Sequence, residues 1–168
     1  MTILVVQAVA VVSACREEDE PQSSLPTRNT AESLIAFARS PSEKTWEAIP
    51  FAETVRLGLA DDLILERSAE ELRDPVNWRL ALSLFRGRSA TSSALELIAT
   101  ERGTLRQSEG PHPHCAASPV PPPPSVAQLR RIWVQPAAPD GCLDWWTVDA
   151  FLNRDGEIEA VTIDLWEP

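Results

Sequence analysis

The sequence predicts an α+β fold in a single domain from about residue 29 to residue 168. We expect two or three short helices and an antiparallel sheet that ends in a C-terminal β-hairpin or meander. Three observations predict this class. Residues 142–166 form two apolar-rich runs around a polar turn, NRDGE. Shorter runs that alternate apolar and polar residues recur earlier in the chain. Hydroxyl-bearing residues precede short stretches with helical spacing.

The helices are predicted from their start and stop signals. They are expected over residues 31–39, 42–48 and 69–73. Thr30 is placed to cap the first helix, and Pro41 ends it. Ser68 and Glu71 form a capping box for the third, in which each side chain bonds the backbone of the other residue, and Pro75 stops this helix.

The strands are predicted where apolar and polar residues alternate. They are expected over residues 51–59, 78–85, 94–100, 104–108 and 131–134. Residues 63–66 fit an extended or a helical piece equally, and residues 86–93 are expected to be a turn-rich connection. Residues 109–124 are too rich in proline for a regular helix or a central strand. Prolines 121–124 favour polyproline II in a stiff surface connection over a ligand for SH3-type domains.

The NRDGE turn has two interpretations. Asp155 and Gly156 are the residues of a tight hairpin turn, in which glycine takes a positive φ. The same segment is similar to the end of a calcium-binding loop. Such a loop needs an acidic residue two positions before Asn153, where this chain has Phe151. The hairpin turn is therefore the preferred interpretation.

The composition excludes some function classes. The chain has 168 residues and a formal net charge of −10. Nucleic-acid binding needs a basic face that displaces counterions from phosphates, and docking on an anionic membrane needs a polybasic patch. We therefore expect neither activity.

The N-terminal stretch indicates export. Residues 3–14 are uncharged and mostly apolar, but twelve residues are too few to span a bilayer as a helix. They have the character of the apolar region of a secretory signal. The stretch ends in Val12, Ser13, Ala14 and Cys15, which resembles the lipobox of bacterial lipoprotein precursors.

The resemblance covers residues 1–15 and implies a lipid anchor. In that class the cysteine thiol receives a diacylglycerol group and the signal is removed just before it, which here implies lipidation of Cys15 after cleavage behind Ala14. Residues 1–14 are then the signal and residues 15–28 a charged and polar tether. The protein would face the extracytoplasmic side of the membrane. The alternatives are an ordinary signal, cleaved or uncleaved, and a buried helix or strand in which Cys15 is a core thiol.

The two remaining cysteines suggest a disulfide. If Cys15 carries lipid, Cys115 and Cys142 are left, and an even remainder in an exported protein favours a bridge. The bridge would close a loop that contains the proline-rich segment. In a reducing compartment both would be free thiols.

His112 and His114 are the weak candidates for metal binding. In an extended backbone, residues two apart share a face, so both imidazoles can reach one ion. Reduced Cys115, with Asp140 or Cys142, could complete a site of mixed ligands. A plain proline-rich loop explains the same residues, and we expect no cofactor.

The tryptophans are the better candidates for a binding surface. Trp146 shares one strand face with Val148, and Trp145 shares the other with Thr147. Trp145, Trp146 or Trp166 could form a platform for a sugar ring or a partner protein. The alternative is that a second layer of the domain covers them.

No catalytic motif is apparent in the sequence. Carboxylates that could in principle pair for hydrolysis are Asp61, Asp62, Asp144, Asp149 and Asp164. Solvated surface groups are the simpler interpretation. We expect a non-catalytic envelope protein that binds another protein or a cell-wall component. The alternative is a small metal-binding or hydrolytic protein that uses His112 and His114.

Overall fold

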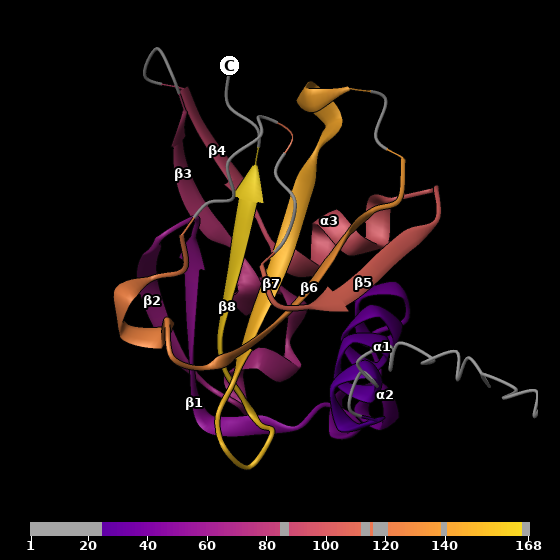
Figure 1. The fold of residues 1–168 in the computed structure, drawn as a ribbon, viewed down its shortest axis with the longest axis vertical. Coiled ribbons are helices and arrows are strands. Elements are labelled where there is room, and N and C mark those ends of the chain that lie inside the picture. The colour runs from indigo at the N-terminus through magenta and orange to yellow at the C-terminus, as the bar shows by residue number, and fades with distance from the viewer. Residues whose placement is uncertain (1–24, 85–87, 112–114, 116–120, 139–140, 166–168) are drawn as a thin grey trace, which may run out of the picture.

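A computed structural model of the chain describes residues 25–84, 88–111, 115, 121–138 and 141–165. It confirms the α+β class. A six-stranded sheet, a small two-stranded sheet and short helices make up this part of the chain (Figure 1). Within those ranges, no helix combines the length and apolar character needed to cross a bilayer.

The large sheet has the strand order β2-β1-β8-β7-β6-β5. Its strands are β1 (Phe51–Leu59), β2 (Asp62–Ser68), β5 (Leu105–Glu109), β6 (Arg130–Pro136), β7 (Trp146–Leu152) and β8 (Ile158–Leu165). Neighbouring strands are antiparallel except for β1 and β8, which are parallel. The predicted antiparallel sheet is present, with a parallel pairing at β1 and β8. β8 is the return arm of a hairpin with β7, so β7 sets its direction.

The C-terminal hairpin is confirmed, and its turn has the predicted chemistry. The side-chain oxygen of Asn153 accepts hydrogen bonds from the backbone N–H groups of Asp155, at 3.0 Å, and Glu157, at 2.9 Å. Gly156 has a φ of +84°, in the left-handed region that favours glycine. Backbone geometry therefore explains this segment.

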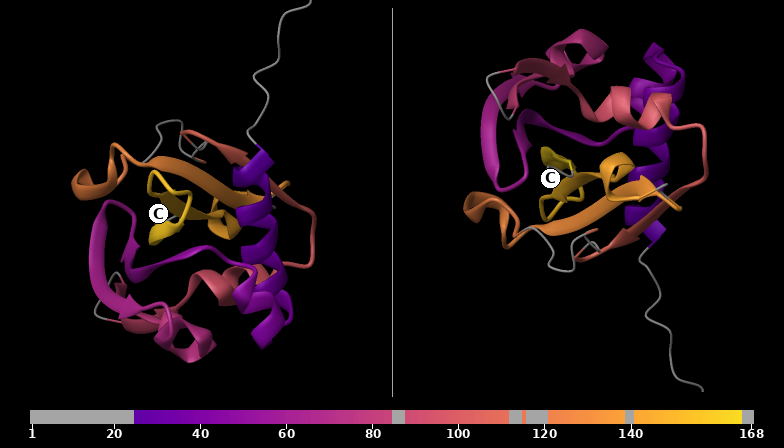
Figure 2. Two further views of the ribbon diagram at one scale, coloured as in Figure 1. Left: turned by 90° about the horizontal axis from the view of Figure 1, so that it is seen from below. Right: turned by 90° about the horizontal axis from the view of Figure 1, so that it is seen from above.

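Helix α1 (Leu25–Arg39) packs on one face of the sheet and buries Leu34, Phe37 and Ala38 in the main core. The predicted helix is confirmed over residues 31–39. The cap was placed wrongly, because α1 begins at Leu25 and Thr30 is a buried residue inside it. Figure 2 shows α1 on one side of the β7–β8 hairpin and the segment 121–129 on the other.

The expected strand over residues 94–100 is wrong. These residues form helix α3 (Ala94–Thr100), with the Ser93 hydroxyl accepting a hydrogen bond from the N–H of Glu96 at 3.0 Å. Leu95 and Ile98 point into the main core beside α1. A short apolar run fits either period, and here the serine cap favours the helix.

The expected connection over residues 86–93 is also wrong. It contains strand β4 (Arg88–Ser92), which pairs antiparallel with β3 (Leu80–Leu84) as the small sheet. The strand predicted from Trp78 starts two residues later. Trp78 instead closes the 3₁₀ turn η2 (Pro75–Trp78), where its buried indole N–H donates to the carbonyl of Leu72 at 2.8 Å.

The remaining helical signals are confirmed in part. Helix α2 (Glu43–Glu47) forms where a helical turn was expected, capped by Ser42. The capping box is also present. The N–H of Ser68 donates to Glu71 at 2.8 Å, and the N–H of Glu71 donates to the Ser68 hydroxyl at 3.2 Å. The helix that follows is only a 3₁₀ turn, η1 (Glu71–Arg73), because η2 starts at Pro75.

Candidate functional site

The face of the sheet turned away from α1 and α3, here called the second face, is polar and buried. Strand alternation puts every other residue of β6, β7 and β8 on it. Its buried polar side chains are Gln135, Thr147, Asp149, Thr162 and Asp164. Buried polar groups need partners, so the arrangement of these side chains is tightly constrained.

An ion pair lies at the centre of the second face. Arg131 of β6 donates from Nε and Nη2 to the two carboxylate oxygens of Asp149 of β7, at 2.8 and 2.7 Å. The side chains are 11% and 1% exposed. The Arg131 guanidinium carbon lies 5.7 Å from the ring centroid of Phe151. The bidentate geometry and the ring together hold the guanidinium in one orientation.

A second polar group lies further along the same strands. The amide oxygen of Gln135 accepts from the guanidinium of Arg106, and its amide nitrogen donates to the Thr147 hydroxyl at 3.1 Å. Arg106 also lies over the ring of Trp133, 5.7 Å from its centroid. Arginine side chains thus satisfy the buried acceptors at two points of the second face.

The segment 121–129 covers one end of the second face. Val126, at the end of the 3₁₀ turn η3 (Pro124–Val126), packs with Phe151 and Ala160 in a small cluster that Leu63 and Leu129 border. The side chain of Arg56 ties the segment to the sheet by donating to the Ser125 hydroxyl at 3.1 Å and to Glu159 at 2.5 Å.

The predicted disulfide is present between Cys115 and Cys142. It links the proline-rich stretch to η4 (Cys142–Asp144), the 3₁₀ turn that leads into β7. Residues 115, 125 and 126 are therefore attached to the rest of the domain by the disulfide, the Arg56 contact and the Val126 cluster respectively.

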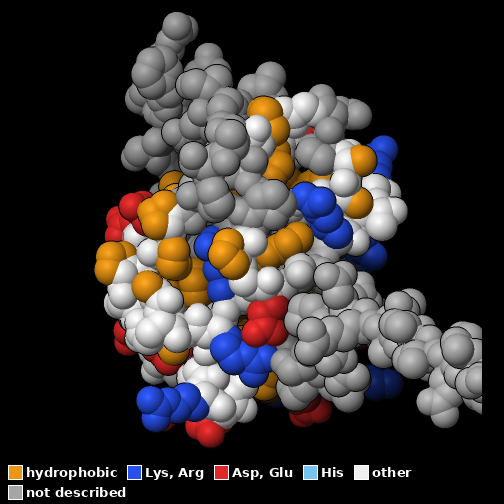
Figure 3. All heavy atoms as spheres, viewed as in Figure 1, with side chains coloured by type: hydrophobic (Ala, Val, Ile, Leu, Met, Phe, Trp, Pro, Cys, Tyr) orange, Lys and Arg blue, Asp and Glu red, His pale blue; other side chains and the backbone are white. Residues whose placement is uncertain are grey.

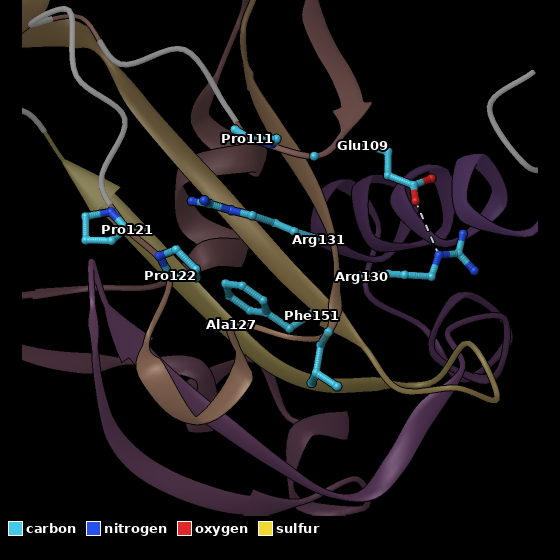
Figure 4. A pocket seen from close by; sticks show the side chains of 10 residues that line it. Glu109, Pro111, Pro121, Pro122, Ala127, Arg130, Arg131 and Phe151 are labelled. Carbon is cyan, nitrogen blue, oxygen red and sulfur yellow. Dashed lines mark hydrogen bonds and ion pairs between the residues drawn. The ribbon is translucent and has the colours of Figure 1, made fainter. Parts of the chain in front are cut away.

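A hollow of about 410 Å³ remains between the segment and the sheet, here called the proline-walled hollow (Figure 4). The described residues that line it are Glu109, Gly110, Pro111, Pro121, Pro122, Ala127, Leu129, Arg130, Arg131 and Phe151. Figure 4 shows Arg131 extended across the hollow, with Phe151 on one side of it and Pro111 on the other. On this face of the molecule, hydrophobic and arginine side chains gather side by side (Figure 3).

No family model, curated protein or solved structure matches this chain. The function is therefore inferred from the chemistry of the site itself.

The tryptophans predicted as a binding surface lie elsewhere. Trp145 and Trp146 are 4% and 7% exposed, and Trp146 belongs to the main core. They line a shallow hollow of about 550 Å³ at the end of α3, together with Leu97, Thr100, Glu101, Arg102, Asp144 and Leu165. Their ring faces are covered, so this hollow offers little aromatic surface for stacking. Trp166 lies outside the described residues.

Several predicted residues cannot be placed. Cys15, His112, His114 and Asp140 lie outside the described ranges. Within those ranges, no three His, Cys, Asp or Glu residues come close enough to hold a metal ion.

The candidate carboxylates are dispersed. Asp61 and Asp62 are exposed at the turn between β1 and β2, and Asp144 is exposed in η4. Asp149 and Asp164 share the second face, opposite Thr162 and Thr147 respectively. Arg131 holds both oxygens of Asp149, which suits a structural ion pair better than acid–base chemistry.

Sequence reasoning missed Arg131 and Phe151 as site residues. The sequence did contain a signal. Each of two apolar-rich segments that were predicted to be strands includes a charged residue, Arg131 in one and Asp149 in the other. A buried charge calls for a partner. Recognising this pair needed the knowledge that β6 and β7 are neighbours.

Proposed function

We propose that this chain is an exported, lipid-anchored bacterial envelope protein that binds a protein or a cell-envelope component and catalyses no reaction. Export and anchoring through Cys15 are supported by the lipobox-like end of the signal segment. They are also supported by the Cys115–Cys142 disulfide, a type of bond that persists in oxidising compartments.

The observation that carries the binding proposal is the proline-walled hollow. It is concave and mostly apolar, with a few fixed polar groups, which is the usual character of a ligand site. Among the described residues that line it, the charged side chains are held in ion pairs, and none provides the nucleophile and base that a hydrolytic site requires. Binding is therefore the function that this geometry supports best.

Lipid anchoring is tested by Cys15→Ser. The wild-type chain should fractionate with membranes and incorporate radiolabelled palmitate, and the variant should do neither. A variant that stays in the membrane fraction and still takes up label would refute the anchor.

Binding at the hollow is tested by site-specific photo-crosslinking in cells. A benzoylphenylalanine residue at Ala127, exposed on the rim of the hollow, should give a discrete adduct. The matched control is the same residue at Ala36, exposed on α1. Equal adducts at both positions, or none at Ala127, would argue against the hollow as the binding site.

A further inference from the structure

Arg131 offers one unused edge to a ligand in the proline-walled hollow. Its Nε and Nη2 donate to Asp149. Nη1 lies at the edge away from Asp149 and has no acceptor among the residues that the structure describes. One face of the guanidinium lies over Phe151, and the planar group has a second face. A ligand can therefore meet Arg131 through a hydrogen-bond acceptor and through a flat apolar group.

The described residues that line the hollow carry no excess charge that would attract an ion. Asp149 compensates Arg131, and Glu109 lies 3.3 Å from Arg130. The whole chain has a net charge of −10. A ligand carboxylate beside Arg131 would also approach Asp149, and the repulsion would offset the attraction. These charges favour an uncharged ligand.

The walls favour an apolar body with few donors. Pro111, Pro121 and Pro122 have no N–H group, and Ala127 and Leu129 add hydrocarbon surface. A sugar would bring several hydroxyl donors, and the carboxylates near the hollow are already paired. Buried donors without acceptors are costly, so a sugar fits this hollow poorly.

From these observations we infer that the hollow binds an uncharged peptide segment of a partner protein. One aromatic side chain of the segment lies among the prolines on the side of Arg131 away from Phe151, and an adjacent backbone carbonyl accepts from Nη1. The volume of about 410 Å³ suits one side chain and its peptide group. This inference rests on the proposed binding function and names the chemistry of the partner.

The test uses three small probes and the full chain carrying Cys15→Ser, with its disulfide intact. N-acetylphenylalaninamide has the ring and a neutral carbonyl, N-acetylglycinamide lacks the ring, and N-acetylphenylalanine replaces the amide with a carboxylate. Binding is followed through the NMR signal of the Arg131 Nε–H. The first probe should move this signal upfield, because a ring stacked on the guanidinium shields it. Loss of the ring should weaken binding about three- to tenfold.

The free acid should bind no more tightly than the amide. Ala127→Asp, which puts a carboxylate on the apolar wall of the hollow, should weaken the shift, and Ala36→Asp should leave it unchanged. Tighter binding of the acid, equal binding without the ring, or no response of Arg131 to any probe would overturn the inference. If a photo-adduct forms at Ala127 and one of these results is also obtained, the hollow remains the proposed binding site. The proposal that its ligand is an uncharged aromatic peptide segment would then be wrong.

Discussion

Removing the disulfide should cost a definite amount of stability. Cys115 and Cys142 are 27 positions apart. The loop-entropy relation for a closed loop of that length gives about 3.5 kcal/mol at 25 °C. For a chain of this size each kcal/mol changes Tm by about 2–4 °C, so the Cys115→Ala/Cys142→Ala variant should melt roughly 7–14 °C lower. The Val126 cluster and the Arg56 contacts remain in this variant, and we expect it to fold.

The assay is denaturant and thermal unfolding of the variant beside the oxidised and reduced wild-type chain. The reduced wild type should match the variant, since both lack the same constraint. Mass analysis after alkylation should show neither Cys115 nor Cys142 labelled before reduction, and both labelled after it. A loss below about 1 kcal/mol would refute the reasoning. It would mean that residual structure already restricts this loop in the unfolded chain or that the bridge does not form.

Three further predictions use the same unfolding measurement. Gly58→Ala should cost about 1–3 kcal/mol, because a Cβ there would collide with a carbonyl oxygen of β2, and an unchanged midpoint would contradict this. Hydrogen bonds from the Ser68 backbone and hydroxyl hold the pKa of Glu71 below 4.5. Glu71→Gln should therefore have a lower free energy of unfolding than the wild type above pH 4.5, and this difference should disappear as the pH falls further. A difference that does not change with pH would refute the prediction. Asp149→Leu should cost about 3–5 kcal/mol, and adding Arg131→Met should recover most of it. If the single and the double variant lose the same free energy of unfolding, the unpaired Arg131 is not the cause of the loss.

Where local chemistry decides the structure, the sequence was a good guide. β1 was predicted with its observed bounds, Phe51–Leu59. The Asp155–Gly156 turn was predicted because few other residues take its backbone conformation. The disulfide followed from the count of cysteines, given the expectation of export.

Non-local packing explains what the sequence could not predict. Residues 94–100 fit a strand by composition, and only the capping bond from Ser93 and the contact of Ile98 with the main core show why they form a helix. The parallel pairing of β1 with β8 joins segments about a hundred positions apart. No local pattern carries that information, since the pairing of two interior strands so far apart in sequence depends on how the rest of the sheet is arranged.

The candidate site shows the same limit in a stronger form. A strand that is buried on both faces loses the apolar–polar alternation from which an exposed face is normally recognised, and all seven residues of β7 are buried. Asp149 is nevertheless charged, which is tolerable only because the register sets it beside Arg131. Pro111, Pro121 and Pro122 line the same hollow as Arg131. A stretch that the sequence presents as a surface connection thus contributes prolines to the wall of the candidate site, and the Cys115–Cys142 disulfide attaches it to the turn before β7.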